Sequence, residues 1–328
     1  MRLLAAFAAL ALLTGCVTAQ PAGMDSTAAA APSPDAAMSE PYRVYTDAGA
    51  PATLDDLVAA MAEADVVILG EQHDDSTTHA LQLRLFQAAD ALDRPAVLSL
   101  EMFERDVQPV LDEYLAGMIR ERDFLAAARP WGNYVTDYRP VVEYAREEGL
   151  PVLAANAPQR YVSRVSRLGP DSLAGLSPAA QAVLPPDVAP ASEALAAEFN
   201  ALMRGMMGHG ASSDDSASDS TTSAAEAVHG SAPDLSNLLA AQNLRDAAMG
   251  HTLAAYLDTH PGHRIVHLNG TFHSEGGLGV PEHLAHYRPG TRALVVTARP
   301  DDAFPNLDPE AFRGTDGGFF IVVDPATR

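Results

Sequence analysis

Two short turns of the sequence carry residue types that can do acid–base or metal chemistry. Both turns read Gly-x-x-His, and they end at His73 and His273. Glu71 lies inside the first turn, and Glu101 ends another apolar run. A carboxylate beside an imidazole is the pairing that a general base or a divalent metal ion such as Mn²⁺ or Zn²⁺ requires. If these four residues hold the metal ion, the chain would be a metal-dependent hydrolase of esters or peptides. Alternatively, Glu71 and His73 would act as a base that activates water against the same substrates.

The elements that would position these side chains are buried strands. Four or so β-favouring residues precede each turn, at 66–69 and at 265–268. Two further apolar runs end at Glu101 and Asn156. Ligands of open α/β sheets bind beyond the carboxyl edge of the strands. We therefore expect the strand ends to meet at one edge and to bring the two turns together.

Alternating helix and strand patterns predict an α/β fold. The first strand at 66–69 is followed by a helix at 77–92 and a strand at 96–100, which is the start of a βαβ unit. We expect one domain at 41–328, built on a mixed, mainly parallel sheet with helices on both faces and a helical subregion at 159–205. The other expected helices are 54–64, 107–117, 138–149 and 235–257, and the other expected strands are 42–45 (at an edge), 152–155, 265–268, 293–297 and 319–323.

Local sequence signals predict where the helix after the first turn begins. Asp74 or Asp75 is expected to cap the helix that begins near Thr77. His79 then falls in the first turns of that helix, where it is either a ligand or an exposed helix residue. Five further histidines have no convergent context and are expected at the surface: His251, His260, His263, His283 and His286.

The N-terminus has the pattern of a lipoprotein signal peptide at 1–15. One arginine is followed by an apolar run at 3–13, which is too short to span a bilayer. Leu13-Thr14-Gly15-Cys16 is a lipobox, so we expect cleavage before Cys16 and lipidation of that cysteine. Val17 rather than Asp follows, which favours retention in the outer membrane. These signals predict a lipid-anchored, periplasm-facing protein with a flexible tether at 16–40.

The chain is strongly acidic, with a formal net charge of -22, and all 21 of its basic residues are arginine. Such a surface repels nucleic acid and anionic lipid, so attachment to the membrane by the lipid alone is expected. Cys16 is the only cysteine, so its lipidation leaves no thiol for a disulfide or a thiolate metal site. Residues 208–233 have almost nothing to bury and predict a disordered insertion.

An aromatic stretch is a second candidate site. Trp131, the only tryptophan, precedes Tyr134 and Tyr138, and the stretch is flanked by Arg129 and Arg139. A phenolate can ligate ferric iron, flat rings can stack on a macrocycle, and arginines can pair with its propionates. The same residues also suit a loop that is fixed to the core by its aromatic rings.

Taken in order, these motifs resemble the ChaN-like haem-binding lipoproteins of the Tiki superfamily. The resemblance covers about residues 53–298. It is carried by the two Gly-x-x-His turns, the stretch 99–108, the aromatic stretch, Asn156-Ala157-Pro158, the segment 242–250 and Gly279-Val280-Pro281. The long acidic insertion at 208–233 departs from the family pattern.

The resemblance implies an outer-membrane lipoprotein that binds haem in haem or iron uptake. It implies a homodimer that holds haem between protomers, with an outer-membrane haem receptor as a further partner. We expect Tyr134 or Tyr138 to ligate the ferric iron and His73 or His273 to support that ligand or to fill the opposite side. The superfamily's site positions correspond to Gly70, Glu71, His73, Glu101, Gly270 and His273, and Arg129 and Arg139 are expected to bind the propionates.

Overall fold

The structure is a computed structural model that describes residues 40–209, 234–312 and 318–327. The chain divides into two units, Met1–Glu40 and Pro41–Arg328, and every element given below lies in the second unit. The predicted signal peptide, Cys16, residues 17–39 of the tether and residues 210–233 of the insertion lie outside the described residues. In the part of the chain that is described, no helix is both long and apolar enough to cross a membrane.

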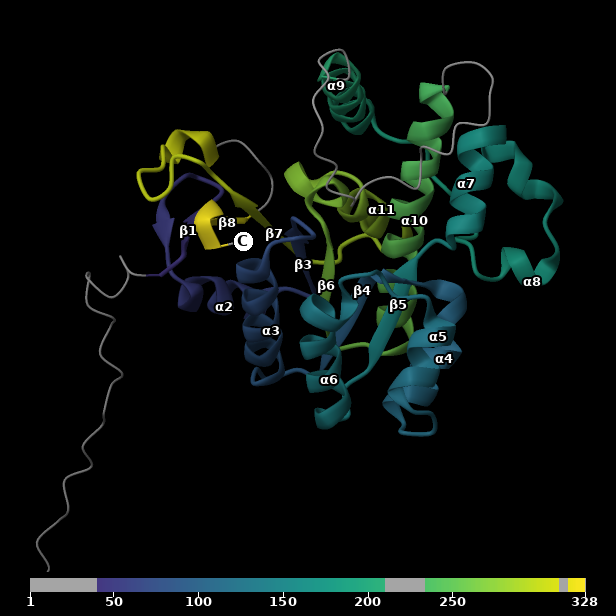
Figure 1. Cartoon of the computed structure of the whole chain (residues 1–328), viewed down its shortest axis with the longest axis horizontal. Helices are drawn as coiled ribbons and strands as arrows, with labels where there is room; N and C mark the ends of the chain where they lie inside the picture. Colours follow the sequence, from purple (N-terminus) through teal and green to yellow (C-terminus); the bar gives the residue numbers. More distant parts are fainter. Residues whose placement is uncertain (1–39, 210–233, 313–317, 328) are drawn as a thin grey trace, which may run out of the picture. The chain divides into compact units, whose positions relative to one another are not determined.

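Within the described residues, eight strands form one sheet in the order β2-β1-β8-β7-β3-β6-β4-β5 (Figure 1). The strands are β1 (Tyr42–Thr46), β2 (Pro51–Ala52), β3 (Val66–Glu71), β4 (Ala96–Glu104), β5 (Val152–Asn156), β6 (Arg264–Gly270), β7 (Ala293–Pro300) and β8 (Phe319–Val323). All neighbours from β8 to β5 are parallel, whereas β1 is antiparallel to both β2 and β8. The predicted mixed, mainly parallel sheet is confirmed.

Helices cover both faces of this sheet. They are α2 (Leu54–Glu63), α3 (Ser76–Asp90), α4 (Gln108–Leu115), α5 (Glu121–Ala128) and α6 (Arg139–Glu148) on one face, and α10 (Leu235–Thr259) and α11 (Val280–Tyr287) on the other. Successive residues of a strand point to opposite faces. Val67 and Leu69 of β3 therefore pack against the first group, and Val66 and Ile68 pack against α10 and α11.

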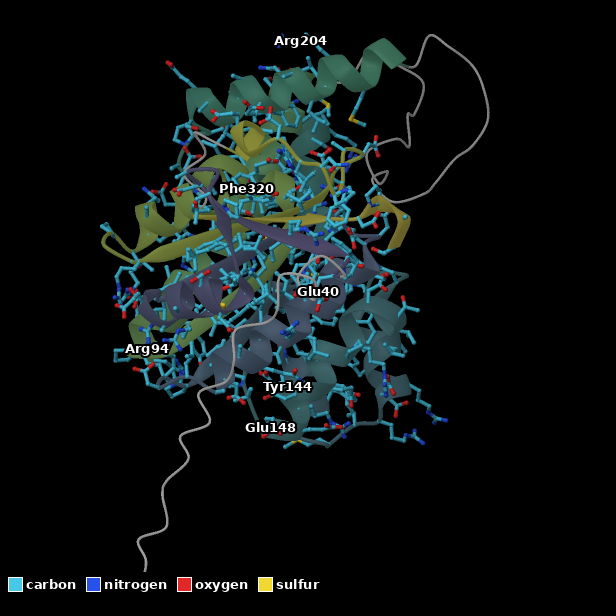
Figure 2. All side chains as sticks on the ribbon, turned by 90° about the vertical axis from the view of Figure 1, so that its left-hand side faces the viewer. Glu40, Arg94, Tyr144, Glu148, Arg204 and Phe320 are labelled. Atoms are coloured by element: carbon cyan, nitrogen blue, oxygen red, sulfur yellow. The ribbon has the colours of Figure 1, made fainter. Side chains whose placement is uncertain are left out.

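The helical subregion predicted at 159–205 consists of α7 (Gln159–Leu168), α8 (Pro178–Gln181) and α9 (Glu193–His209). Val162 and Val165 of α7 pack against Leu244 of α10. Figure 2 shows α9, marked by Arg204, at one end of the view, and Arg94, which lies just before β4, toward the other end. Helix α9 therefore lies toward the carboxyl edge of the parallel strands.

The structure corrects four local predictions. β4 continues to Glu104, so Glu101 lies within the strand and not after it, and the β4–β5 register shifts between Leu100 and Glu104. The aromatic stretch forms a π-helical turn, η2 (Tyr134–Tyr138), rather than a loop. Helices α5 and α11 have no counterpart in the prediction, and β2 pairs outside β1, which is therefore not the edge. Short 3-10 turns are η1 (Arg105–Val107), η3 (Pro170–Gly175), η4 (Thr271–His273), η5 (Glu275–Gly277), η6 (Pro309–Phe312) and η7 (Pro325–Thr327).

Candidate functional site

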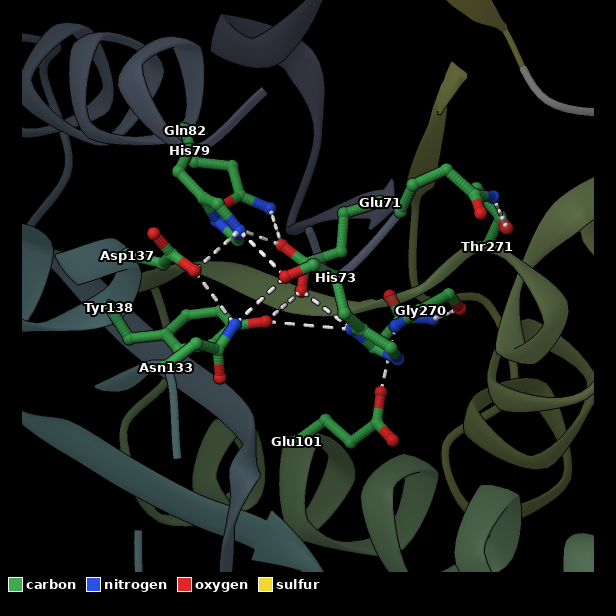
Figure 3. A network of polar contacts seen from close by, with 12 residues as sticks. Glu71, His73, His79, Gln82, Glu101, Asn133, Asp137, Tyr138, Gly270 and Thr271 are labelled. Atoms are coloured by element: carbon green, nitrogen blue, oxygen red, sulfur yellow. Dashed lines mark hydrogen bonds and ion pairs between the residues drawn. The ribbon is translucent and has the colours of Figure 1, made fainter. Parts of the chain in front are cut away.

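The two Gly-x-x-His turns lie side by side, because they follow neighbouring strands in register. β3 pairs with β6 so that Gly70 faces Asn269 and Glu71 faces Gly270. Gly270 has no side chain, and a Cβ atom at this position would lie 2.8 Å from Nε2 of His73. The imidazole of the first turn therefore packs onto the backbone of the second (Figure 3). The expectation that the strand ends bring the two turns together is confirmed.

A buried carboxylate orients His73. Glu71 is 1% exposed, and its Oε1 lies 2.9 Å from Nδ1 of His73. The hydroxyl of Tyr138 donates to the same oxygen, and the amide of Gln82 donates to Oε2. Burial lowers the pKa of His73, but the hydrogen bond to Glu71 and the charges of Glu101 and Glu71 outweigh it, so the pKa lies above its usual value. Glu71 is thus held as an acceptor that fixes the ring of His73.

Helix α3 and the aromatic segment fix the backbone of the first turn. Asp75 caps α3 by accepting the N–H of Thr78 at 3.0 Å, which confirms the predicted cap. Nε2 of His79 lies 3.2 Å from the carbonyl oxygen of His73, and the amide of Asn133 donates to that oxygen at 2.8 Å. His79 is buried in this network, so it is neither the exposed residue nor the ligand that the sequence suggested.

The ring of His73 is the accessible part of this network. Its side chain is 24% exposed, whereas that of Glu71 is fully buried. The ring meets Trp131 edge-on, with centroids 4.7 Å apart and planes at 89°. With Nδ1 directed at Glu71, Nε2 has no hydrogen-bond partner among the described residues. This nitrogen is therefore available to a ligand.

The second imidazole, His273, lies between two buried carboxylates. Its Nε2 is 3.2 Å from Oε1 of Glu101, and its Nδ1 is 2.5 Å from Oδ1 of Asp246. The other oxygen of Glu101 accepts the backbone N–H of Gly270 at 2.7 Å. Burial lowers the pKa of His273, but the two carboxylates raise it to about 10. Burial also raises the pKa of Glu101, yet the charge of His273 brings it well below its usual value. Glu101 and His273 therefore form a buried ion pair.

The two predicted tyrosine ligands lie in the interior. Tyr134 packs among aromatic rings, with its centroid 5.7 Å from that of Phe103 and 5.9 Å from that of Phe124. Tyr138 is completely buried and donates its hydroxyl proton to Glu71. Burial raises the pKa of both phenols well above the usual value. Both tyrosines are therefore neutral and inaccessible in this arrangement, which corresponds to the alternative in which aromatic rings fix the segment to the core.

The two arginines predicted for propionates are already paired. Arg129 donates to Glu104 and to Asp106 at 2.7 Å each, and its backbone is left-handed with φ 53°. Arg139 donates to Glu121. The spacing along the chain does not reveal these carboxylate partners, and the binding of propionates by the two arginines stays a prediction.

The predicted divalent metal site has no matching ligand set. Within residues 40–209, 234–312 and 318–327, no three His, Cys, Asp or Glu side chains converge as ligands of one ion. The reason is that consecutive strands direct the two carboxylates to opposite faces. Glu71 bonds to Gln82 of α3, whereas Glu101 bonds to His273 beside α10. Glu71, His73, Glu101 and His273 thus form two adjacent pairs rather than one coordination sphere.

Several polar residues of the site are absent from the sequence prediction. Gln242, Arg245 and Asp246 lie on one face of α10, and Gln242 contacts Nδ1 of His273 at 2.9 Å. Their i, i+3, i+4 spacing is a usable signal, although the same spacing also describes a solvated helix face. His283 is buried and bonded to Asn243 at 2.9 Å, so the surface position expected for it is wrong.

Comparisons with known proteins identify the family and the fold of the chain. A family model described as haem-binding uptake, Tiki superfamily, ChaN matches residues 57–284. No curated protein sequence matches the chain. Among solved structures, one titled "Cofacial heme binding to ChaN of Campylobacter jejuni" is similar over 86% of this chain and 97% of that chain, with 17% identity and a TM-score of 0.60.

Two further structures are more distant. The type III effector HopBA1 has 10% identity and a TM-score of 0.44, over 86% of this chain and 96% of its own. The erythromycin esterase EreC, in an open conformation, has 14% identity and a TM-score of 0.43, over 87% of this chain and 83% of its own. The family match spans most of the chain, and the fold agrees with that of the Campylobacter jejuni protein. This chain therefore belongs to the ChaN family of haem-binding uptake proteins in the Tiki superfamily.

Proposed function

We propose that the chain binds haem at the carboxyl edge of its sheet, with the imidazole of His73 facing the haem. The observation that carries this proposal is the hydrogen bond from Nδ1 of His73 to Glu71 at 2.9 Å, which leaves Nε2 as the available nitrogen of a partly exposed ring. A carboxylate behind a ligating histidine fixes the tautomer and strengthens the donor nitrogen. Haem, when bound, would supply a ferric iron that an imidazole nitrogen can ligate.

The surroundings of His73 fit a flat apolar ring. Trp131 lies edge-on against the imidazole and is itself partly exposed. An apolar side chain left in water is a surface that a macrocycle can cover. The family and the shared fold support haem as the ligand.

Ligation by Tyr134 or Tyr138 is the alternative for the iron. It requires the π-helical turn η2 to leave the core, because both phenols are buried and Tyr138 is bonded to Glu71. It also requires loss of a phenol proton, which the raised pKa of each tyrosine opposes. The imidazole of His73 is already partly exposed, so it can reach a ligand without a rearrangement of the core.

We extend the proposal to the setting of the protein. The lipobox supports lipidation at Cys16 and a periplasm-facing position at the outer membrane. Family membership supports a role in haem uptake. We further propose, from the resemblance of the sequence motifs alone, that a homodimer holds the haem and that an outer-membrane receptor supplies it.

The test is a titration of haemin into the protein, followed by the Soret band. We expect a Soret shift with the wild-type chain, affinity at least tenfold lower for His73→Ala, and a spectrum unchanged in position for Tyr138→Phe. His286→Ala is the matched control, because this histidine pairs at the surface with Asp187. A wild-type chain that gives no Soret shift would sink the proposal. A Soret band that moves in Tyr138→Phe but not in His73→Ala would assign the iron to the tyrosine.

A second candidate function is hydrolysis of an ester or peptide. It is favoured by the same contact, because a carboxylate at Nδ1 also orients an imidazole as a general base. Turnover of a chromogenic ester that His73→Ala abolishes, without haem present, would support this reading.

A further inference from the structure

Arg245 lies on the face of α10 that is directed at the candidate site. It is one turn after Gln242, whose amide contacts His273, and it precedes Asp246, which bonds to the same histidine. Its Nη2 donates to Oε1 of Gln159 at the start of α7. Arg245 therefore links the helical subregion to the part of the site that contains His273.

Arg245 has no ion-pair partner among the described residues. The negative groups whose charge it senses are Glu101, Glu104 and Asp246. Glu101 is paired with His273, and Glu104 accepts a hydrogen bond from Arg129 at 2.7 Å.

Asp246 is also engaged elsewhere. Its Oδ1 is bonded to His273, whereas its buried Oδ2 has no hydrogen-bond partner among the described residues. None of these carboxylates is bonded to Arg245, and its guanidinium donates to the neutral amide of Gln159.

A cation in this position is costly. Burial lowers the pKa of Arg245, which means that desolvation of the guanidinium exceeds the compensation by nearby negative charge. A guanidinium stays protonated at any working pH, so the cost is not removed by loss of a proton. A planar fork of N–H donors is the group that best matches an incoming carboxylate.

We propose that Arg245 binds a propionate carboxylate of the haem, and this inference rests on the proposed function. Glu101 connects the two places. It accepts the N–H of Gly270, onto which His73 packs, and it pairs with His273, which Asp246 beside Arg245 also contacts. The haem would face His73 while one propionate reaches the guanidinium on α10. The assignment replaces Arg129 and Arg139, whose carboxylate partners are Glu104, Asp106 and Glu121.

The experiment compares haemin with its dimethyl ester, in which both propionates have lost their charge. Wild-type protein and Arg245→Gln are titrated with each porphyrin in the same detergent, and the dissociation constant is taken from the Soret band. We expect the wild-type chain to prefer haemin over the ester by roughly ten- to a hundredfold, the range for a hydrogen bond between charged groups. Arg245→Gln is expected to bind both porphyrins with the affinity that the wild-type chain has for the ester.

Two variants serve as controls. Arg129→Gln removes an arginine that is already paired with Glu104 and Asp106, and it is expected to keep the preference for haemin. Arg245→Lys keeps the charge without the fork, and it is expected to keep part of the preference. This variant and the wild-type comparison also test the inference if Arg245→Gln fails to fold.

The outcomes separate this inference from the proposed function. Equal binding of haemin and ester by the wild-type chain, or an undiminished preference in Arg245→Gln, overturns the role of Arg245 while haem binding stands. A preference lost equally in Arg129→Gln and Arg245→Gln also overturns it, because the effect is then one of general surface charge. If the wild-type chain binds neither porphyrin, the proposed function itself fails, and the role of Arg245 fails with it.

Discussion

The two histidines that share one sequence pattern are in different chemical states. His73 has one carboxylate partner and a partly exposed ring, whereas His273 is buried between Glu101 and Asp246. A histidine with both nitrogens bonded to carboxylates has no lone pair for a ligand. At the scale of single residues, the first turn therefore offers a binding group, and the second turn offers a charge that holds Glu101 in place.

The ion pair of Glu101 and His273 should make stability depend on pH in a defined window. The folded pKa of Glu101 lies below its usual 4.5, so its contribution is present above pH 4.5 and is lost as the pH falls toward the folded value. The folded pKa of His273, about 10, lies above its usual 6.5, so its contribution is complete below pH 6.5 and is lost as the pH rises toward 10. The pair is thus most stabilising between pH 4.5 and 6.5.

We predict that Glu101→Gln lowers the free energy of unfolding by about 3–5 kcal/mol within that window, since it leaves a buried imidazolium with one fewer counter-charge. The difference from the wild type should shrink at lower and at higher pH. Urea unfolding across the pH range measures it. The control is Asp123→Asn, at an exposed pair with Arg120, where no resolvable change is expected. A difference that stays constant with pH would contradict an ionic origin.

At the scale of elements, the N-terminus of α3 helps to position His73. Its cap, Asp75, is 1% exposed, and its first turn carries His79, which contacts the carbonyl of His73. We predict that Asp75→Ala lowers the free energy of unfolding by about 1 kcal/mol and also weakens haem binding.

Thr53→Ala is the control. It removes the corresponding cap of α2, where Thr53 accepts the N–H of Asp56 at 3.1 Å. It should cost similar stability and leave haem affinity unchanged.

Urea unfolding and haemin titration of the two cap variants are to be measured side by side. If both variants lose haem affinity equally, global stability rather than the position of α3 controls the site.

The elements also show what a sequence can predict here and what it cannot. Both turns were predictable, because a short apolar run that ends in Gly-x-x-His is a local pattern, and so was the cap at Asp75. The sequence predicts that β3 and β6 end at the same edge of the sheet. It does not predict that they pair residue by residue, because their register depends on packing. Arg245 and Asp246 lie in mid-helix, where a polar residue is usually solvated, so nothing local marks them as residues of the site. The same limit applies to Arg129, whose partner Glu104 is 25 residues away in the chain.

At the scale of the whole molecule, the sheet has two edges that differ in length. β2 is an edge of two residues, whereas β5 has five residues and borders a groove of about 810 Å³. An open edge strand presents unpaired backbone groups to other chains. Gln108 covers this edge, because its amide donates to the carbonyl of Val152 at 2.8 Å and accepts the N–H of Ala154 at 2.7 Å. One side-chain amide thus occupies the place that the peptide group of a further strand would take.

We predict that Gln108→Ala increases self-association of the whole protein, because it uncovers these two backbone groups without changing the acidic surface that keeps copies apart. Sedimentation should show more large species for this variant, and the increase should be greater at high salt, where repulsion between chains of net charge -22 is screened.

Two further variants test the cause. Gln108→Glu keeps an acceptor for the N–H of Ala154 and adds a negative charge at the edge, so this variant should stay monodisperse. Gln181→Ala, which alters an exposed glutamine far from the sheet edge in sequence, is the control. If Gln108→Ala and Gln181→Ala sediment alike at every salt concentration, the edge is protected by the groove or by net charge alone, and the amide of Gln108 serves only to hold α4 on β5.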